Sequence, residues 1–306
     1  MDSLSREILQ NWQVRKSKAQ KLAFIEMMQR QIPGLRVEEG GFPRCRNLVL
    51  GDVETAKVVF TAHYDTCARL PFPNFITPKN LLVYIAYSLL ISLPFLALMF
   101  GLAILLMQWI GLGGWMLGMV LGMAAMLYVF MLGPANTHTV NDNTSGVLTL
   151  VETIRSMREE ERKGCAFVFF DHEENGLLGS GTFASQHKKQ MKNKLLVNFD
   201  CVSDGNHFLF VSSGKARKRY GEMLRAAFAE MEGKTLYFES TRSAFYPSDQ
   251  ANFPLGVGVA AMRKKRGLGL YMSRIHTEKD TVLQEENIAY FAAGAKRLAG
   301  LLGGGE

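Results

Sequence analysis

Hydrophobic and polar residues follow two different periods along this chain, one typical of helices and one typical of strands. Apolar side chains recur with helical spacing over 5–31, before Pro33 and Gly34, and predict an opening helix. Short runs rich in β-branched and aromatic residues predict strands at 47–50, 58–62, 165–170, 195–199, 207–212, 235–238 and 256–262. Amphipathic stretches predict later helices at 145–161, 217–231 and 285–302. Strands that alternate with helices predict an α/β fold with a mixed, largely parallel sheet flanked by helices.

This pattern stops in the middle of the chain, where residues 80–141 contain no Asp, Glu, Lys or Arg. The segment divides into apolar stretches at 81–110 and 115–132, joined by the uncharged turn 111–114. Each stretch is long enough, at roughly 20 residues per span, to cross a bilayer. The alternative is a helical hairpin buried in a soluble core, but the rest of the chain is too short to surround two such helices. The sequence therefore predicts an inserted two-helix transmembrane hairpin.

Small residues are spaced so that the two predicted membrane helices can approach each other. Gly114, Gly118 and Gly122 recur every four residues in the second helix, and Ala97 and Gly101 repeat that spacing in the first. A tight antiparallel hairpin is expected, with a kink at the proline inside the first helix.

A hairpin returns the chain to the side of the membrane from which it entered. The expected division is therefore a peptidase-like domain formed by 1–79 and 135–306, interrupted by the hairpin at 80–134. Arg69 and Lys79 lie on the side of this domain, whereas the hairpin turn has no charge. The positive-inside rule then predicts a membrane protein with two spans and a cytoplasmic catalytic domain.

Composition narrows the class of protein further. The 306 residues are 48% hydrophobic, which is enough for a large core and excludes a disordered chain. The four cysteines form no CxxC pair, so neither a disulfide scaffold nor a structural zinc knuckle is expected, and inert thiols are the simplest interpretation. The N-terminus has no apolar stretch typical of a signal peptide.

The formal net charge of +7 does not predict a nucleic-acid partner. The basic runs 215–219 and 263–266 lack the interleaved aromatic residues of a nucleic-acid surface. A solvated face beside an anionic membrane surface is the simpler interpretation. Composition leaves the oligomeric state open.

Candidate chemistry follows the predicted strands, at the edge where functional groups of an α/β sheet gather. The candidate residues, two imidazoles and five carboxylates, are His63, Asp65, Asp142, Glu173, Glu174, Asp200 and His276. Each segment alone has an ordinary structural interpretation, such as a helix N-cap turn around Asp142 or an acidic turn at Glu173. Together, two His and three carboxylates can hold a pair of divalent cations about 3.5 to 4 Å apart, and one Glu remains as a general base.

The segments AHYDT, NDNTSG, EENGLLGS, NFD and HTEKDT carry a resemblance to the M28 family of metallopeptidases, in the family's order. A weaker match is Ser248-Asp249-Gln250, where the family often has S-D-H. The resemblance covers the chain except for the hairpin and the first 40 or so residues. The chain departs from the family between Asp65 and Asp142, where the hairpin replaces a short loop.

The resemblance implies a fold like that of the zinc exopeptidases and a role for each candidate. It makes His63, Asp142 and Asp200 the ligands of one Zn²⁺ ion. It makes Asp142, Glu174 and His276 the ligands of a second, with Co²⁺ or Mn²⁺ as possible substitutes. Asp65 supports His63, and Glu173 is the catalytic base.

The expected function is that of a membrane-anchored two-zinc aminopeptidase acting on peptides at or from the membrane. One alternative is another amide reaction at the same metals, such as deacylation or glutaminyl cyclisation. Another is a catalytically inactive membrane scaffold with the same fold.

Overall fold

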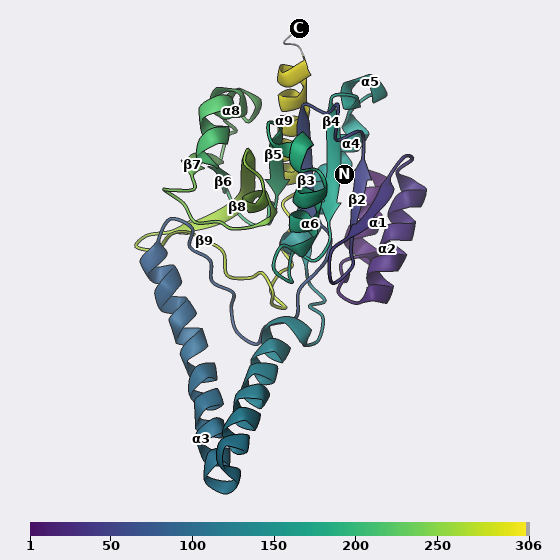
Figure 1. Ribbon diagram of the computed structural model, residues 1–306. Coiled ribbons are helices and arrows are strands. Elements are labelled where there is room, and N and C mark those ends of the chain that lie inside the picture. The colour runs from purple at the N-terminus through teal and green to yellow at the C-terminus, as the bar shows by residue number, and fades with distance from the viewer. Residues whose placement is uncertain (304–306) are drawn as a thin grey trace.

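The computed structural model describes residues 1–303, which form a nine-stranded sheet, the helices around it and a long helical arm (Figure 1). The strands are β1 (Arg36–Gly40), β2 (Cys45–Leu50), β3 (Val58–His63), β4 (Cys165–Phe170), β5 (Leu195–Phe199), β6 (His207–Ser212), β7 (Thr235–Ser240), β8 (Gly256–Lys265) and β9 (Gly269–Tyr271). The helices of the body are α1 (Ser3–Asn11), α2 (Lys18–Gln31), α4 (Ser145–Ser156), α5 (Glu159–Arg162), α6 (Leu178–Gln186), α7 (Lys188–Met191), α8 (Gly214–Ala227) and α9 (Glu285–Gly303).

The sheet is mixed, with the strand order β1-β2-β4-β3-β5-β8-β6-β7 and β9 paired to β8. Its centre, from β4 through β3 and β5 to β8, is parallel. The prediction of a mixed sheet is confirmed, but parallel pairing is limited to this centre and to the pair β6 and β7. β1 and β2 pair antiparallel at one margin, and β8 pairs antiparallel with both β6 and β9.

Both faces of the central strands are apolar and buried, as expected for parallel strands between helices. Alternate side chains of β3 illustrate this, because Phe60 points into the larger core and Val59 into a second one. Helices α1, α2, α4, α8 and α9 contribute to the larger core. α6 and α7 contribute Phe183 and Met191 to the second core. The sheet is therefore fixed from both sides, and its strand ends are held in place.

The predicted opening helix is wrong in one respect, because the structure has two helices separated by residues 12–17. Ser17 caps α2, and its hydroxyl accepts a hydrogen bond from the Gln20 backbone N–H while the Gln20 side chain accepts one from the Ser17 N–H. This capping box starts a new helix at Lys18. The break places Arg15 in the interior, where it is fully buried.

Other predicted elements also need correction. The helix predicted at 145–161 ends at Ser156, since Met157 has an extended backbone, and α5 follows as a separate short helix. Four strands and α-helices were missed, namely β1, α6, α7 and β9. β1 is rich in charged residues, and α6 contains two glycines and three small polar residues, so neither has the apolar pattern on which the predictions rested.

The uncharged segment forms a helical arm, composed of α3 (Leu81–Leu127) and the π-helical turn η1 (Tyr128–Leu132). The arm reverses at Ile110 and Gly111, where the backbone leaves the helical region and Gly111 has a φ of 61°. The reversal is shorter than the predicted turn 111–114, because the helix resumes at residue 112. The backbone stays helical through Pro94, so the structure has no break where a kink was expected.

The two halves of the arm touch near its tip and separate toward the body (Figure 1). An added Cβ on Gly118 would lie 2.4 Å from the Ala103 Cα, and one on Gly122 would lie 2.4 Å from the Met99 side chain. Glycines therefore allow the close approach, as expected. The partners differ from the prediction, because Gly101 has no atom within 4 Å of its added Cβ.

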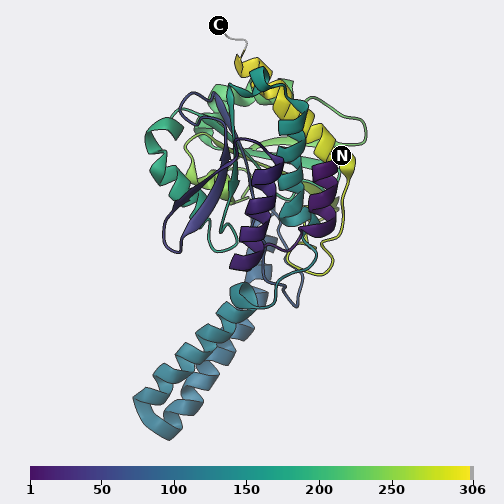
Figure 2. The same ribbon diagram turned by 90° about the vertical axis from the view of Figure 1, so that its right-hand side faces the viewer.

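The arm projects away from the body (Figure 2). Leu81–Leu132 is long and apolar enough to span a membrane, with a mean hydropathy of 2.6, and only 11% of its most apolar stretch is buried. A core helix of a soluble protein would be mostly buried, so the interpretation as a buried core hairpin does not fit this arm.

Candidate metal centre

The candidate residues converge at the carboxyl ends of the central parallel strands. His63 is the last residue of β3, and Asp200 directly follows β5. Glu173 and Glu174 lie in the loop after β4, and the buried apolar side chains of β4 fix where that loop begins. Asp142 lies in η2 (Val140–Thr144), the turn that leads into α4. The topology therefore brings together residues that are more than 100 positions apart.

The carboxylate of Asp142 lies between the two imidazoles. Its Oδ1 is 3.3 Å from Nε2 of His63, and its Oδ2 is 2.9 Å from Nε2 of His276. Asp200 Oδ1 lies 3.6 Å from the same His63 nitrogen, and Glu174 Oε2 lies 3.2 Å from the same His276 nitrogen. Each imidazole thus faces Asp142 and one further carboxylate. This arrangement forms two adjoining donor sets that share Asp142.

The clustering of carboxylates changes their affinity for protons. Burial raises the pKa of Glu174 to about 8, and it raises the pKa of Glu173 well above its usual range. Burial opposes ionisation of Asp142 as well, but hydrogen bonds with His276 and His63 outweigh it and lower its pKa. Burial would lower the pKa of His276, yet the carboxylates of Glu174 and Asp142 raise it to about 9. So much buried negative charge requires positive charge close by.

The donor set fits a divalent metal. The Oε1 atom of Glu174 is buried and has no hydrogen-bond partner within residues 1–303, although its carboxylate faces His276. Buried polar atoms nearly always have a partner, and a cation between these ligands would supply one. Imidazole nitrogens with carboxylate oxygens are donors that suit zinc and related metals.

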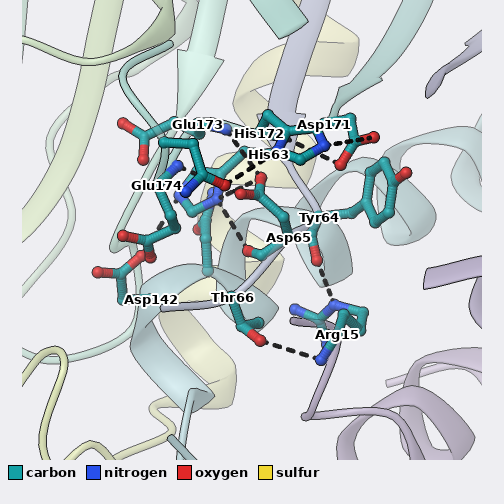
Figure 3. A network of polar contacts seen from close by, with 12 residues as sticks. Arg15, His63, Tyr64, Asp65, Thr66, Asp142, Asp171, His172, Glu173 and Glu174 are labelled. Atoms are coloured by element: carbon teal, nitrogen blue, oxygen red, sulfur yellow. Dashed lines mark hydrogen bonds and ion pairs between the residues drawn. The ribbon is translucent and has the colours of Figure 1, made fainter. Parts of the chain in front are cut away.

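Asp65 supports the site differently from the prediction. The Nδ1 atom of His63 faces the backbone carbonyl of Asp65 at 3.1 Å, whereas the Asp65 carboxylate is 3.7 Å away. That carboxylate accepts hydrogen bonds from the backbone N–H groups of Glu173 (3.0 Å) and Glu174 (3.2 Å) (Figure 3). Asp65 therefore orients His63 mainly through its backbone and holds the loop of the two glutamates with its side chain.

The loop of Asp142 is fixed by a residue of the His276 segment. Asp280 accepts hydrogen bonds from the backbone N–H groups of Asn141 (2.8 Å) and Asp142 (2.9 Å). Thr281, the next residue, is exposed. His276 itself has a left-handed backbone, with a φ of 60°. A non-glycine residue in that conformation is uncommon and is found often at functional sites.

Sequence reasoning missed two buried cations from the first 40 residues. Arg15 donates from its guanidinium to the backbone carbonyls of Tyr64 and Trp12 and to the Thr144 hydroxyl, and its own N–H donates to Thr66 (Figure 3). It thereby joins the segment after β3 to the segment after Asp142. The available sequence signal was the capping box at Ser17, which marks the start of a new helix but does not indicate the burial of Arg15.

Lys21 supports the loop after β4 in a similar way. Its Nζ atom lies 2.6 Å from Asp171 Oδ1 and 3.0 Å from Nε2 of His172, and the Lys21 and Asp171 side chains are both buried. His172 also contacts Asn175, and neither contact directs it toward the ligand cluster. Lys21 has no sequence signal beyond its place in a helix.

Two cysteines lie beside the ligands. Cys67 has its sulfur within 4.8 Å of ligand atoms of Glu174 and His276, and Cys201 is equally close to Asp142 and Asp200. Burial raises the pKa of both thiols well above the usual value, which favours the protonated form. Protonated thiols are poor metal ligands, so packing beside the centre is the simpler role.

Comparison of the sequence with protein-family models supplies the deciding observation. The model described as "Peptidase family M28" matches residues 127–295, more than half of the chain. The chain belongs to peptidase family M28. It is therefore a metallopeptidase. A separate comparison of the sequence with curated proteins gives no match.

Solved structures similar to this M28 peptidase include enzymes with more than one activity. The Legionella pneumophila LapA aminopeptidase has a TM-score of 0.57 at 13% identity, covering 97% of this chain and 67% of LapA. The Porphyromonas gingivalis glutaminyl cyclase has a TM-score of 0.57 at 14% identity, covering 96% of each chain. A Zn-dependent exopeptidase from Parabacteroides distasonis has a TM-score of 0.56 at 13% identity, covering 97% and 96%. At these identities the similarity concerns the fold alone.

Proposed function

We propose that this M28 peptidase is a membrane-anchored aminopeptidase that uses two zinc ions. The observation that carries the proposal is the Asp142 carboxylate, whose two oxygens each face a different imidazole. A carboxylate in this position can bridge two cations. His63 and Asp200 would complete one set of ligands, and Glu174 and His276 the other. Two cations that share a ligand can stabilise both the attacking and the leaving group of a hydrolysis.

Glu173 is the proposed general base. Its carboxylate lies within 4.8 Å of ligand atoms of His63 and Asp200, and burial raises its pKa well above the usual range. When bound, the zinc ions would acidify water and polarise the scissile carbonyl. Glu173 would take a proton from the attacking water and return it to the leaving amine. Asp65 would keep Glu173 in place through the backbone hydrogen bond between them.

The proposed membrane anchor is the arm, which would occupy 80–134 between the two parts of the peptidase domain, 1–79 and 135–306. Two apolar helices with an uncharged connection suit a pair of membrane spans. The end of β8 and the turn that follows it support this placement, because they expose Lys264, Lys265 and Arg266. This basic turn, Lys264–Arg266, lies next to the base of the arm, where Asn80 donates a hydrogen bond to the carbonyl of Leu268 at 3.4 Å. Such a surface would face anionic headgroups.

The proposed orientation has the peptidase domain in the cytoplasm. Arg69 and Lys79 lie at the base of the arm, and its tip, residues 109–115, carries no charged residue. A cysteine introduced at Leu112 should react with a membrane-impermeant thiol reagent from outside intact cells. Labelling only after lysis would indicate the opposite orientation or a tip that lies inside the bilayer.

The activity is tested by a substrate panel with metal analysis. The purified protein should contain two zinc ions per chain and release N-terminal residues from aminoacyl p-nitroanilides. N-acyl amino acids test deacylation, and peptides with N-terminal Gln test cyclisation. The cyclisation test is needed because the fold is similar to that of a glutaminyl cyclase. Turnover of the N-terminal Gln substrate alone would overturn the aminopeptidase proposal. Activity with Co²⁺ or Mn²⁺ would identify a different physiological metal.

A further inference from the structure

A cavity of about 360 Å³ lies between the metal centre and the base of the arm. His276 and Tyr246 line it on the side of the metal centre, and the Tyr246 hydroxyl donates a hydrogen bond to the backbone carbonyl of Asp200. Tyr84 and Ile91 of α3 and Phe130 of η1 line it on the side of the arm. The cavity is therefore bounded by a proposed metal ligand at one end and by both halves of the arm at the other.

The arm is fixed to the body by aromatic contacts around this cavity. Phe72 packs against Phe130 with ring centres 5.7 Å apart, and Phe75 packs against Tyr87 at 5.4 Å. These two phenylalanines belong to the loop that follows the Asp65 segment, so the loop joins the ligand strand β3 to both halves of the arm. The two halves are separated where they meet the body (Figure 1), and both contribute residues to the cavity lining.

Three polar side chains of the arm that line the cavity already have partners. The Tyr87 hydroxyl donates to the carbonyl of Pro73, and the Ser88 and Ser92 hydroxyls donate to carbonyls one helical turn earlier. What this wall offers a ligand is therefore mainly apolar and aromatic surface. Aromatic rings at this level of a membrane helix suit the boundary between lipid and water.

The segment Leu70–Pro73 forms a wall between this cavity and a second one, whose lining residues are different. It measures about 410 Å³, and its lining includes Arg69, Glu278 and Lys279. The charged lining is thus on one side of the wall, and the arm and its apolar surface are on the other. An extended molecule at the metal centre would meet aromatic and aliphatic side chains of the arm on one side and charged side chains on the other.

We infer that the arm-side cavity takes the large apolar N-terminal residues of peptides that partition into the bilayer. This inference rests on the proposed aminopeptidase function and names its substrate class. A volume of about 360 Å³ is within the range of about 300 to 1,000 Å³ that small-molecule pockets usually have. The peptide's apolar end would pass between the separated halves of the arm, so that its first amide bond reaches His276 and the neighbouring ligands without leaving an apolar surface.

The experiment compares two substitutions in one turn of α3. Ile91→Trp fills the cavity from the arm, whereas Leu90→Trp changes a neighbour that is 65% exposed and is not part of the lining. The full-length, zinc-loaded protein in lipid nanodiscs is given two substrates, a peptide beginning Leu-Leu-Phe and the small soluble alanine p-nitroanilide. Binding of the Leu-Leu-Phe peptide, carrying a C-terminal fluorophore, is measured separately in the Glu173→Gln background.

Ile91→Trp should lower kcat/KM for the apolar peptide about tenfold and raise its Kd by a similar factor. It should leave turnover of alanine p-nitroanilide within about twofold, and Leu90→Trp should change neither substrate. An unchanged Kd with Ile91→Trp, or an equal loss with both tryptophan variants, would overturn the inference. If the unsubstituted protein cleaves neither substrate, the aminopeptidase proposal fails, while the Kd comparison still decides whether this cavity binds apolar peptides.

Discussion

Around His63 the carboxylates and cations are buried and tied to backbone groups, whereas the arm exposes leucines over its whole length. Asp65 and Asp280 each accept two backbone hydrogen bonds, and Arg15 donates to three other residues through its guanidinium. In the arm, Leu98 is 63% exposed and Leu90 is 65% exposed. The metal centre holds polar groups away from water, and the arm presents apolar groups outward.

The two regions therefore need different surroundings. Buried carboxylates are stable only where donors or cations compensate them, and the chain supplies both through a rigid network. Exposed leucines on two long helices are stable in lipid, because no apolar surface is then exposed to water. The helices also form their backbone hydrogen bonds internally. The loop with Phe72 and Phe75 connects these regions, which places the proposed chemistry next to the proposed membrane.

The largest effect should come from removing metal. Chelation with 1,10-phenanthroline should abolish peptidase activity, because the clustered carboxylates alone have no means to polarise a carbonyl. Zinc should restore activity, and the membrane association of the protein should not change. Full activity in the chelated protein, verified to be free of metal by elemental analysis, would contradict the metal centre.

Replacing the proposed base should have the next largest effect. Glu173→Gln should reduce kcat by about 10² to 10⁴-fold, since the amide cannot accept the proton, and zinc content should stay the same. Glu278→Gln is the matched control, because Glu278 is exposed and lies outside the ligand cluster. A similar kcat for both variants would remove Glu173 from the reaction.

A charge on the arm tests the other half of the comparison. Leu98→Lys should cost about 2.5 to 3.5 kcal/mol of membrane insertion, because an ammonium group would lie within the hydrocarbon region. The fraction of protein extracted from membranes by alkaline carbonate should rise. Met223→Lys on the exposed surface of α8 should leave that fraction unchanged. An equal result for both would indicate that lipid does not cover the arm.

Arg15 tests how far the body depends on buried donors. Arg15→Met should lower the free energy of unfolding by about 2 to 4 kcal/mol, because it leaves buried carbonyls without donors. It should also weaken zinc binding by about tenfold through the loosened His63 and Asp142 segments. Arg44→Met, which removes only an exposed ion pair with Glu39, should change stability by less than about 0.5 kcal/mol in the same denaturation assay.

The smallest effect is expected at the basic turn beside the arm. Lys265→Ala and Arg266→Ala should each weaken binding of phosphatidylglycerol by about 1 kcal/mol, measured by lipid titration of the detergent-purified protein. Lys188→Ala, an exposed lysine on α7, is the control. If all three variants bind the lipid equally, the basic turn does not contact headgroups.

Much of the fold could be predicted because its central strands are short, continuous runs of apolar residues. The bounds predicted for β4, β5 and β6 match the structure, since nearly every residue in them is buried. β1 could not be found this way, because it lies at the margin of the sheet and its side chains are charged. The local pattern reports burial, so elements with little burial escape it.

The candidate site was visible in the sequence for a related reason. Ligands at strand ends follow apolar runs, so His63 and Asp200 could be located before any contact was known. Arg15 and Lys21 could not be located, because nothing near them in sequence indicates burial. Their partners, such as Tyr64 and Asp171, lie 49 and 150 positions away.

The sequence by itself determined the family, the apolar strands, the uncharged arm and the residues able to bind metal, because each depends on residue type and local spacing. Only the tertiary structure decided that Asp142 lies between His63 and His276, and that the Asp65 carboxylate holds the glutamate loop. It also decided which residues face each glycine of the arm. These features are contacts between distant segments, and their distances are set by how the whole sheet packs rather than by any local pattern.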